Sequence, residues 1–594
     1  MAEPQWRNLV QMFFEQTDRL GGRPFLWSKV DGKYRSLSWL KTREKVARLA
    51  GVLAAKGVGP GDRVVILSDS RPEWCISDLA IMTSGAISVP AYTTNTTEDH
   101  LYILENSGAK GAIVSSRALA ARFLPAAHRL DNLRFVIAID DPGISQSLNV
   151  EIGRWAKALQ GADPDPERWR EAVNAIERKQ TACLVYTSGT GGAPKGVMIP
   201  HGAILHNCEG AEDVLSDLPG GRERFLSFLP LSHAYEHTGG QFLPIYLGAE
   251  IYYAESLEKL GTNFIEARPT IMTVVPRLFE MLQTRITRAV EKQGGLRAKL
   301  FARTLELGRR NFLDAKSLSF AERCENKALD FVVRRKAQAR FGGKVKALIS
   351  GGAPLNPEVG LFFAALGLPL LQGYGQTEAA PVISVNRPSD VDMSTVGPPM
   401  KGVEVKIAED GEILVRGELV MNGYWRNEEE TAAVLKDGWL YTGDIGHLDA
   451  RGHLLITDRK KDIVINDRGD NVSPQRIEGF LTFEPEVCQA MVYGDRKPHL
   501  VGLIVPDPDW LKAWAKANNK KGGLEVLCQD RDLHRALDAA VSRVNKTMSG
   551  PERMRRFAIA NAPFTIENSQ MTPTMKIRRH VISKEYLDIL EGLY

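Results

Sequence analysis

The chain has 594 residues, of which 43% are hydrophobic and 25% are charged, and its formal net charge is +4. A chain of this length can bury more than one hydrophobic core, so several structural units are expected. The small net charge gives no overall electrostatic argument for nucleic-acid binding. The six cysteines are widely spaced without a CxxC pair, which argues against a disulfide framework and against a zinc knuckle.

The hydropathy pattern contains no signal for export or for membrane insertion. The first twenty residues lack the basic segment followed by an apolar segment that marks a secretion signal. No run reaches the roughly 18 apolar residues of a transmembrane helix. We therefore expect a cytoplasmic protein that is soluble or lies on a membrane surface.

Residues 38–140 predict alternating helices and strands. An amphipathic helix beginning near Leu40 is followed by a glycine-rich turn at 57–61 and by a buried strand at 63–67. Further strands are predicted at 87–90, 112–114 and 135–140. This alternation is typical of an α/β fold.

The stretch 184–197, LVYTSGTGGAPKGV, is the strongest candidate for a phosphate-binding loop. Its glycines let the backbone approach a ligand, its hydroxyls donate hydrogen bonds, and Lys195 adds a compact positive charge. A Walker A loop is excluded, because Lys195 lies between Pro194 and Gly196 and is followed by a short strand-like run rather than a helix. The candidate residues are Thr187, Ser188, Gly189, Thr190, Gly191, Gly192 and Lys195.

Residues 233–237, HAYEH, match the HxxEH spacing of one class of zinc protease. That function needs His233, Glu236 and His237 on one helix and a distant third ligand, which no second motif supplies. A zinc protease is kept as an alternative function from a different class. A histidine packed beside an apolar pocket is the other interpretation.

Residues 284–346 form a basic stretch, with 17 Lys and Arg against 6 Asp and Glu. Within it, apolar residues recur at helical spacing, which predicts an amphipathic helix with a basic polar face. These residues are Phe320, Cys324, Ala328, Phe331 and Val332. Two interpretations stay open: a solvated helical face, and peripheral attachment to anionic lipid.

Two strands further along the chain, at 345–349 and 368–371, each lead into a glycine-containing loop. The loops are SGGAP at 350–354 and GYGQTE at 373–378. Because ligands of α/β folds tend to bind at strand ends, both loops are candidate binding sites.

The pattern of predicted strands and helices changes after about residue 460. Shorter strands lead through DGWLYTGDIG and DRKKDIV into a mixture of short strands and helices. We predict a domain boundary near Lys461, with residues 1–460 in an N-terminal domain and residues 461–594 in a C-terminal domain.

These segments together resemble the adenylate-forming (acyl-activating) superfamily, especially its long-chain fatty acyl-CoA synthetases. The motifs YTSGTGGAPKG, LPLSHAYE, SGGAP, GYGQTE, YTGD, DRKKD and TPTMKIRR follow one another in the family's order. Two positions depart from the commoner pattern: Gly191 replaces a threonine, and Met575 replaces a glycine. The resemblance implies a large α/β N-terminal domain of mixed sheets with packed helices and a β-rich subdomain, and a small mobile α+β C-terminal domain.

The resemblance also implies two half-reactions in one site. A fatty carboxylate attacks the α-phosphate of ATP to give acyl-adenylate and pyrophosphate, and the thiol of coenzyme A then displaces AMP. ATP, Mg²⁺ and coenzyme A are thus implied, and no nucleic acid. Other acids, such as aryl or bile-type carboxylates, and a carrier protein as acceptor remain alternatives, and the oligomeric state is left between monomer and homodimer.

Carried onto this sequence, the resemblance assigns roles to the nucleotide-binding positions. The loop at 187–195 would hold the β- and γ-phosphates, Thr377 would contact the α-phosphate, and Glu378 would bind Mg²⁺ through oxygen. Tyr374 would offer a flat face to adenine. The remaining implied positions around the base are Gly351, Gly352, Ala353, Pro354, Gly373 and Gly375.

The resemblance also assigns residues to the ribose, to the acid and to the charge that develops during the attack. Asp444 would accept the ribose hydroxyls with help from Arg459. His233 would lie at the acyl pocket close to the carboxylate. Lys576 would bridge the acid and the α-phosphate as charge develops.

The C-terminal domain is implied to turn between the two half-reactions. Lys461 occupies the family's hinge position, and Gly469 lies in the loop on the coenzyme A side. We expect rotation about Lys461 to move Lys576 away from the active site and to bring that loop to it.

Overall fold

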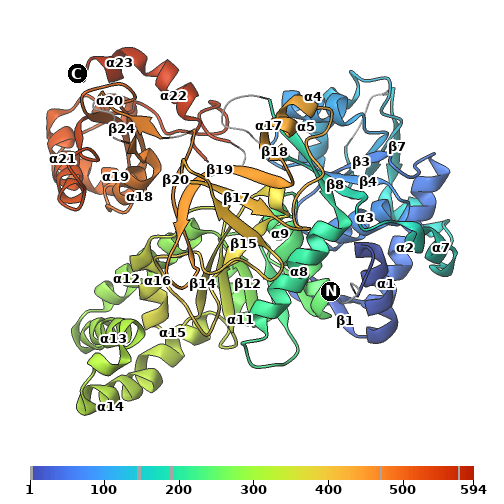
Figure 1. The fold of residues 1–594 in the computed structure, drawn as a ribbon, viewed down its shortest axis with the longest axis horizontal. Helices are drawn as coiled ribbons and strands as arrows, with labels where there is room; N and C mark the ends of the chain where they lie inside the picture. Colours follow the sequence, from blue (N-terminus) through green and yellow to red (C-terminus); the bar gives the residue numbers. More distant parts are fainter. Residues whose placement is uncertain (1–4, 144–148, 188–192, 462, 468–470, 573–575) are drawn as a thin grey trace.

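The computed structural model describes the chain except residues 1–4, 144–148, 188–192, 462, 468–470 and 573–575. Figure 1 shows a large body and a smaller C-terminal unit that follows strand β20 (Leu454–Arg459). Among the described helices, none combines the length and the hydropathy needed to cross a bilayer.

One sheet of the body has seven strands in the order β7-β6-β5-β3-β4-β8-β9. All its neighbours are parallel except β8 and β9, which pair antiparallel. The strands are β3 (Arg63–Leu67), β4 (Ile87–Pro90), β5 (Gly111–Val114), β6 (Phe135–Ala138), β7 (Glu151–Arg154), β8 (Thr181–Thr187) and β9 (Lys195–Pro200). The predicted strands are confirmed, except that the one at 135–140 ends at Ala138, and the phosphate-loop candidate joins two strands as expected.

Helices cover both faces of this sheet, which explains why its central strands are continuously apolar. Four of them are α2 (Trp39–Ala55), α3 (Pro72–Thr83), α4 (Thr97–Ser107) and α5 (Arg117–Ala127). The amphipathic helix predicted near Leu40 is α2, and it begins at an N-cap, Ser38, whose side chain accepts from the Lys41 N–H.

A second sheet has eight strands in the order β15-β14-β13-β12-β10-β11-β1-β2. They are β1 (Pro24–Val30), β2 (Lys33–Ser38), β10 (Arg224–Ser227), β11 (Glu250–Tyr253), β12 (Ile271–Val274), β13 (Ala347–Ser350), β14 (Leu370–Gly375) and β15 (Val382–Val385). Helix α8 (His201–Leu215) packs between the two sheets, because its Ile204 belongs to one buried cluster with Val64 of β3 and Phe225 of β10. This shared core fixes the two sheets relative to each other.

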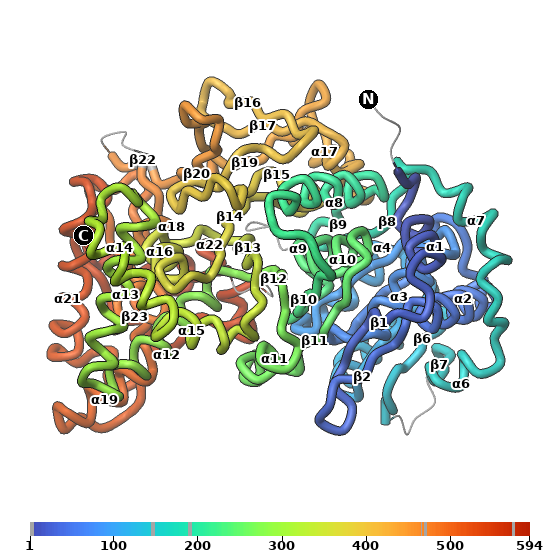
Figure 2. The backbone as a smooth tube through the Cα atoms, turned by 90° about the horizontal axis from the view of Figure 1, so that it is seen from below, coloured from blue at the N-terminus to red at the C-terminus, as the bar shows by residue number. Residues whose placement is uncertain are grey.

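A third, five-stranded sheet lies along one side of the body (Figure 2). Its strands are β16 (Glu404–Ile407), β17 (Glu412–Arg416), β18 (Leu435–Lys436), β19 (Trp439–Leu448) and β20. The antiparallel register of β19 and β20 pairs Asp444 with Arg459.

The C-terminal unit has its own buried cluster, which includes Ile504, Leu537 and Phe557. It contains the two-stranded β21 (Val464–Ile465) and β22 (Asn471–Val472), and a three-stranded sheet of β23 (Val487–Tyr493), β24 (Leu500–Pro506) and β25 (Met554–Ile559). Helices α18 (Pro474–Leu481) and α21 (Arg531–Asn545) pack on that sheet. The predicted fold class, a large α/β body with a β-rich subdomain and a smaller α+β unit, is confirmed.

The basic stretch folds into helices α12 (Pro276–Gln293), α13 (Gly295–Leu313), α14 (Phe320–Leu329) and α15 (Arg335–Arg340), with a π-helical turn at Asp330–Arg334. In Figure 1 they form the lower left corner of the molecule. The helix is as predicted, but its apolar stripe faces solvent: Phe320 is 83% exposed and Phe331 is 62% exposed. One basic residue of the stretch is not at the surface: Arg334 is buried and donates to backbone carbonyls and to Asp330.

Candidate active site

A cavity of about 1130 Å³ lies where the three sheets and the C-terminal unit meet. It collects most of the described residues that the sequence singled out. These are Thr187, Lys195, His233, Gly351, Gly352, Gly373, Tyr374, Gly375, Thr377, Glu378, Arg459, Lys461 and Lys576. Ala353, Pro354 and Asp444 are not among its lining residues, and Ser188, Gly189, Thr190, Gly191, Gly192 and Gly469 fall outside the described residues.

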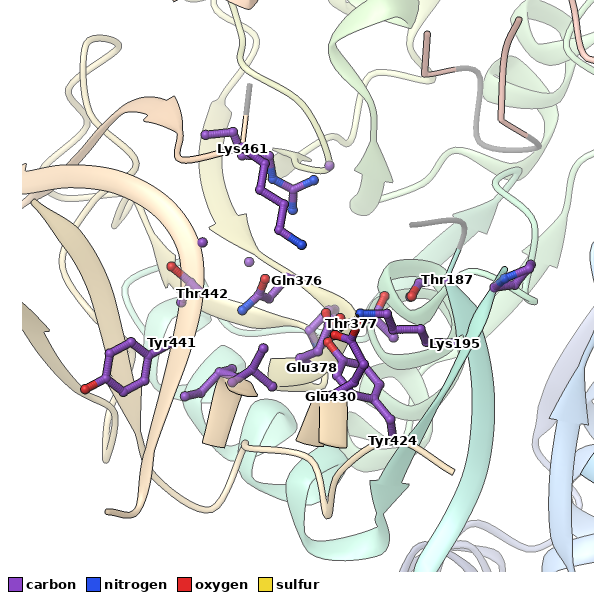
Figure 3. Close-up of a pocket in the computed structure, with 18 of the residues that line it drawn as sticks. Thr187, Lys195, Gln376, Thr377, Glu378, Tyr424, Glu430, Tyr441, Thr442 and Lys461 are labelled. Atoms are coloured by element: carbon purple, nitrogen blue, oxygen red, sulfur yellow. Dashed lines mark hydrogen bonds and ion pairs between the residues drawn. The ribbon is translucent and has the colours of Figure 1, made fainter. Parts of the chain in front are cut away.

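Lys195 is the first residue of β9, so the strand holds its side chain at the cavity wall. Its Nζ lies 2.5 Å from the Glu430 carboxylate and 5.0 Å from the centre of the Tyr424 ring (Figure 3). Hydrogen bonding from Lys195 lowers the pKa of Glu430. Neither Glu430 nor Tyr424 was predicted, since no motif links the loop at 187–195 to helix α17 (Glu428–Val434).

Thr377 and Glu378 occupy a short 3₁₀ turn directly after β14 (Figure 3). The Tyr424 hydroxyl donates to Glu378 Oε1 at 2.9 Å, which orients the carboxylate. The described residues include no group of three or more His, Cys, Asp or Glu side chains able to hold a metal. A single carboxylate nevertheless fits Mg²⁺, because that ion keeps several waters and takes other oxygens from substrate phosphates.

Tyr374, Asp444 and Arg459 form a hydrogen-bonded group beside the cavity. The Tyr374 hydroxyl donates to Asp444 Oδ2 at 2.6 Å, and Arg459 Nε donates to Asp444 Oδ1 at 2.9 Å. Burial, followed by the neighbouring Asp444 charge, raises the pKa of Tyr374 well above its usual value, so it stays a donor. The pairing of β19 with β20 places Asp444 opposite Arg459, and Tyr374 reaches the pair from β14.

His233 and Lys576 come from opposite ends of the chain and meet at the cavity. His233 caps a three-residue helix (Ala234–Glu236), where its Nδ1 accepts the Tyr235 N–H at 3.1 Å. Burial and then the Lys576 charge lower the pKa of His233 to about 4. The imidazole is therefore neutral at physiological pH, and Lys576 is the cation of this pair.

The other two residues of the HxxEH motif point away from His233. Glu236 accepts from Ser227 Oγ at 2.6 Å and from the Thr273 hydroxyl, while His237 Nε2 pairs with Asp78 of α3 at 2.8 Å. Because the three side chains bind three different partners, the zinc-site geometry of a protease is not found within the described part of the chain. The motif is structural at Glu236 and His237.

Comparison with known proteins agrees with this geometry. Residues 13–425 match the AMP-binding enzyme family, and residues 461–594 match the AMP-binding enzyme C-terminal domain. The chain belongs to the AMP-binding enzyme family. Within that family, its curated relatives confirm the predicted resemblance to the long-chain acyl-CoA synthetases.

Two relatives illustrate that branch. The long-chain-fatty-acid–CoA ligase FadD15 of Mycobacterium tuberculosis is 33% identical, over 95% of this chain and 93% of its own. The peroxisomal long chain acyl-CoA synthetase 6 of Arabidopsis thaliana is 31% identical, over 95% of this chain and 83% of its own.

Solved structures share the fold. The adenylation domain of a carboxylic acid reductase from Segniliparus rugosus, in complex with AMP and a co-purified carboxylic acid, has a TM-score of 0.78 at 21% identity, covering 100% of this chain and 95% of that one. The anthranilate CoA ligase AuaEII, in complex with anthranoyl-AMP, has a TM-score of 0.73 at 20% identity, covering 99% of each chain.

The buried Glu236 carboxyl should make stability depend on pH. Burial raises its pKa from 4.5 to about 7, so between these values the folded state binds a proton that the unfolded state has released, and stability falls as pH rises, by about 3 kcal/mol in all. Glu236→Gln should remove this loss. Unfolding by urea at about pH 5 and about pH 8 measures it, and the same pH dependence in Glu236→Gln and wild type would contradict the assignment.

Proposed function

We propose that the protein is an AMP-forming ligase that activates a long-chain fatty acid with ATP and transfers the acyl group to coenzyme A. The observation that carries the proposal is the meeting of Lys576 with His233 in a cavity also lined by Thr187, Lys195 and Glu378. The relatives that match over most of their length, named as a long-chain-fatty-acid–CoA ligase and a long chain acyl-CoA synthetase, support the acid and the acceptor.

The first half-reaction builds negative charge at one phosphorus. A carboxylate oxygen of the acid bonds to the α-phosphorus, the bond from that phosphorus to the bridging oxygen breaks, and pyrophosphate leaves. Lys195 and Thr187 would hold the β- and γ-phosphates, and Mg²⁺ on Glu378 would neutralise part of their charge. Lys576 would stabilise the developing charge, while neutral His233 would border the acid without adding a second cation.

In the second half-reaction the coenzyme A sulfur attacks the acyl carbon, the thiol proton is released, and AMP leaves with the oxygen it received from the acid. We propose Asp444 as the ribose acceptor; its carboxylate is already oriented by Tyr374 and Arg459.

The proposal is tested by measuring AMP and pyrophosphate release for acids from short to very long chain, with and without coenzyme A. Long-chain acids should be preferred and coenzyme A should be consumed. A preference for aryl or bile-type acids, or turnover only with an acyl carrier protein, would replace the long-chain reading. Absence of acid-dependent AMP formation would end it.

We also propose that the enzyme works in the cytoplasm at the inner face of a membrane. Its acid partitions into lipid, so contact with a bilayer would supply substrate directly. The surface that we assign to this contact is argued below.

Lys576→Ala should abolish the first half-reaction selectively. We expect acid-dependent adenylate formation to fall by roughly 10² to 10³ or more, because a preorganised cation is lost where charge develops. Conversion of supplied acyl-adenylate to acyl-CoA should persist. Lys584→Ala, an exposed lysine on α22 (Arg579–Glu585) of the same unit, is the matched control, and equal loss of both half-reactions in Lys576→Ala would contradict this role.

We propose that residues 461–594 turn as one domain about Lys461 between the half-reactions. Lys461 is the second residue after the strand that ends at Arg459, and the preceding Lys460 is anchored to Asp410 and Glu412. The body is thus tied down up to this point. Torsions at Lys461 are the first available to move the unit that carries Lys576.

Lys461→Pro should separate the two steps. Proline fixes φ near −65°, so adenylate formation should continue while thioester formation falls by orders of magnitude. Lys461→Ala, which removes the charge but leaves the torsions free, should retain both steps. Single-turnover rates decide: unchanged thioester formation in Lys461→Pro would remove the hinge from this residue.

A further inference from the structure

One helical surface of the body exposes apolar side chains that a packed helix would normally bury. On the run 320–340 the exposed residues at helical spacing are apolar: Phe320 (83% exposed), Phe331 (62%) and Val332 (47%), with Cys324 and Ala328 between them. Single exposed apolar residues are ordinary, but several on one helix face mark a binding surface.

The same helices are held to the body through their other side. Leu329 is buried, and the buried Arg334 guanidinium donates to the carbonyls of Ala365, Asn326 and Thr304. The face is therefore rigidly presented. Its exposure does not come from a loosely attached helix.

Uncompensated positive charge accompanies the apolar residues. The ion pairs of the described residues reach Arg303, Arg309, Arg310, Arg334 and Lys346 of the basic stretch, but not Lys327, Arg335 or Lys336. Arg335 lies over the Phe331 ring at 4.0 Å, so cation and aromatic ring are adjacent.

We propose that this docking face (Phe320, Lys327, Phe331, Val332, Arg335 and Lys336) binds the protein to an anionic lipid surface, with the two phenylalanines entering the boundary between headgroups and acyl chains. A helix with this composition lies in the membrane interface, and its cations attract acidic headgroups. A second copy of the chain fits less well, because pairing two such faces would oppose like charges.

The position of the docking face suits this role. Figure 1 places α14 at an outer corner, well separated from the C-terminal unit. A bilayer on α14 therefore leaves that unit free. The inference stands on the face itself and does not depend on the ligase activity.

Sedimentation with vesicles tests the proposal. Wild type should bind vesicles of phosphatidylcholine mixed with an equal amount of phosphatidylglycerol, bind phosphatidylcholine alone more weakly, and release in high salt. Phe320→Ser with Phe331→Ser, and separately Lys327→Glu with Arg335→Glu, should each weaken binding at least about tenfold. Arg334 is left unchanged, since reversing a buried charge would disturb the fold.

Matched controls come from the opposite side of the molecule, around α2 (Figure 1). There Val30→Ser with Leu40→Ser removes another exposed apolar pair, and Lys41→Glu with Lys157→Glu reverses two exposed lysines. Binding that survives in both docking-face variants, or that falls equally in the controls, overturns the proposal. A wild-type dimer that Phe320→Ser with Phe331→Ser converts to monomer, with vesicle binding unchanged, would assign the face to self-association instead.

A second inference comes from Lys195 and rests on the proposed ATP binding. Its only cavity-lining acidic partner among the described ion pairs is Glu430, at 2.5 Å, on a helix whose first turn is acidic throughout. If Lys195 binds a phosphate oxygen of ATP, the Glu430 carboxylate competes with that oxygen for the same ammonium group. We infer that Glu430 is a positioning residue, which holds Lys195 toward the cavity and is exchanged for phosphate when ATP binds.

Glu430→Gln keeps the shape and removes the competing charge. It should tighten ATP binding roughly threefold to tenfold by calorimetry and lower KM for ATP with little change in kcat. Glu428→Gln, on the same helical turn but exposed and away from the cavity, is the control. Weaker ATP binding, or a lower kcat with a raised Mg²⁺ requirement, overturns the inference, whereas no ATP binding by any of the proteins would count against the proposed function.

Discussion

The cavity brings together positively charged side chains from distant parts of one chain. Their mutual repulsion must therefore be offset so that it does not destabilise the fold. Lys195 and Arg459 lie in two strands and Lys460 follows the second, and the structure gives each a carboxylate: Glu430, Asp444, and the pair Asp410 and Glu412. These ion pairs are partly exposed and contribute little stability individually. On the proposed function their contribution is placement, because each cation is held where the phosphates of ATP would replace or join its partner.

Lys576 meets the same constraint in another way. It arrives on the C-terminal unit, next to a histidine whose pKa is too low for it to carry a second charge. A neutral His233 lets the lysine approach without repulsion. Burial of the imidazole, the first cause of its low pKa, is therefore part of what allows His233 and Lys576 to line the same cavity.

The architecture was largely predictable because its signals are local. Buried parallel strands such as β3 and β4 read as short apolar runs between turns, and the loops after β13 and β14 follow them directly. Most of the described residues that the motifs singled out line one cavity. Glu430 and Tyr424 were missed because their pairing with Lys195 spans more than 200 residues and follows from sheet packing, which periodicity does not encode.

The basic stretch shows a different limit of sequence reasoning. Helical spacing correctly grouped Phe320, Phe331 and Val332 on one face, but spacing cannot say whether a neighbouring element covers that face. Here these three side chains stay largely exposed, and the helix packs through Leu329 and Arg334 instead. Arg334 can be buried because the several N–H groups of its guanidinium donate to backbone carbonyls at once. The compact ammonium of a lysine would reach fewer of these acceptors.

The two surfaces assigned to movement and to attachment lie on different units, and this separation is required by the proposed cycle. A domain that rotates between two half-reactions cannot also be fixed to a bilayer without dragging the membrane contact through each turn. The docking face belongs to the body, whose shared core joins the two large sheets. Attachment there does not restrict the backbone torsions at Lys461. The body can then stay beside the source of its acid while the C-terminal unit alone exchanges Lys576 for the coenzyme A side.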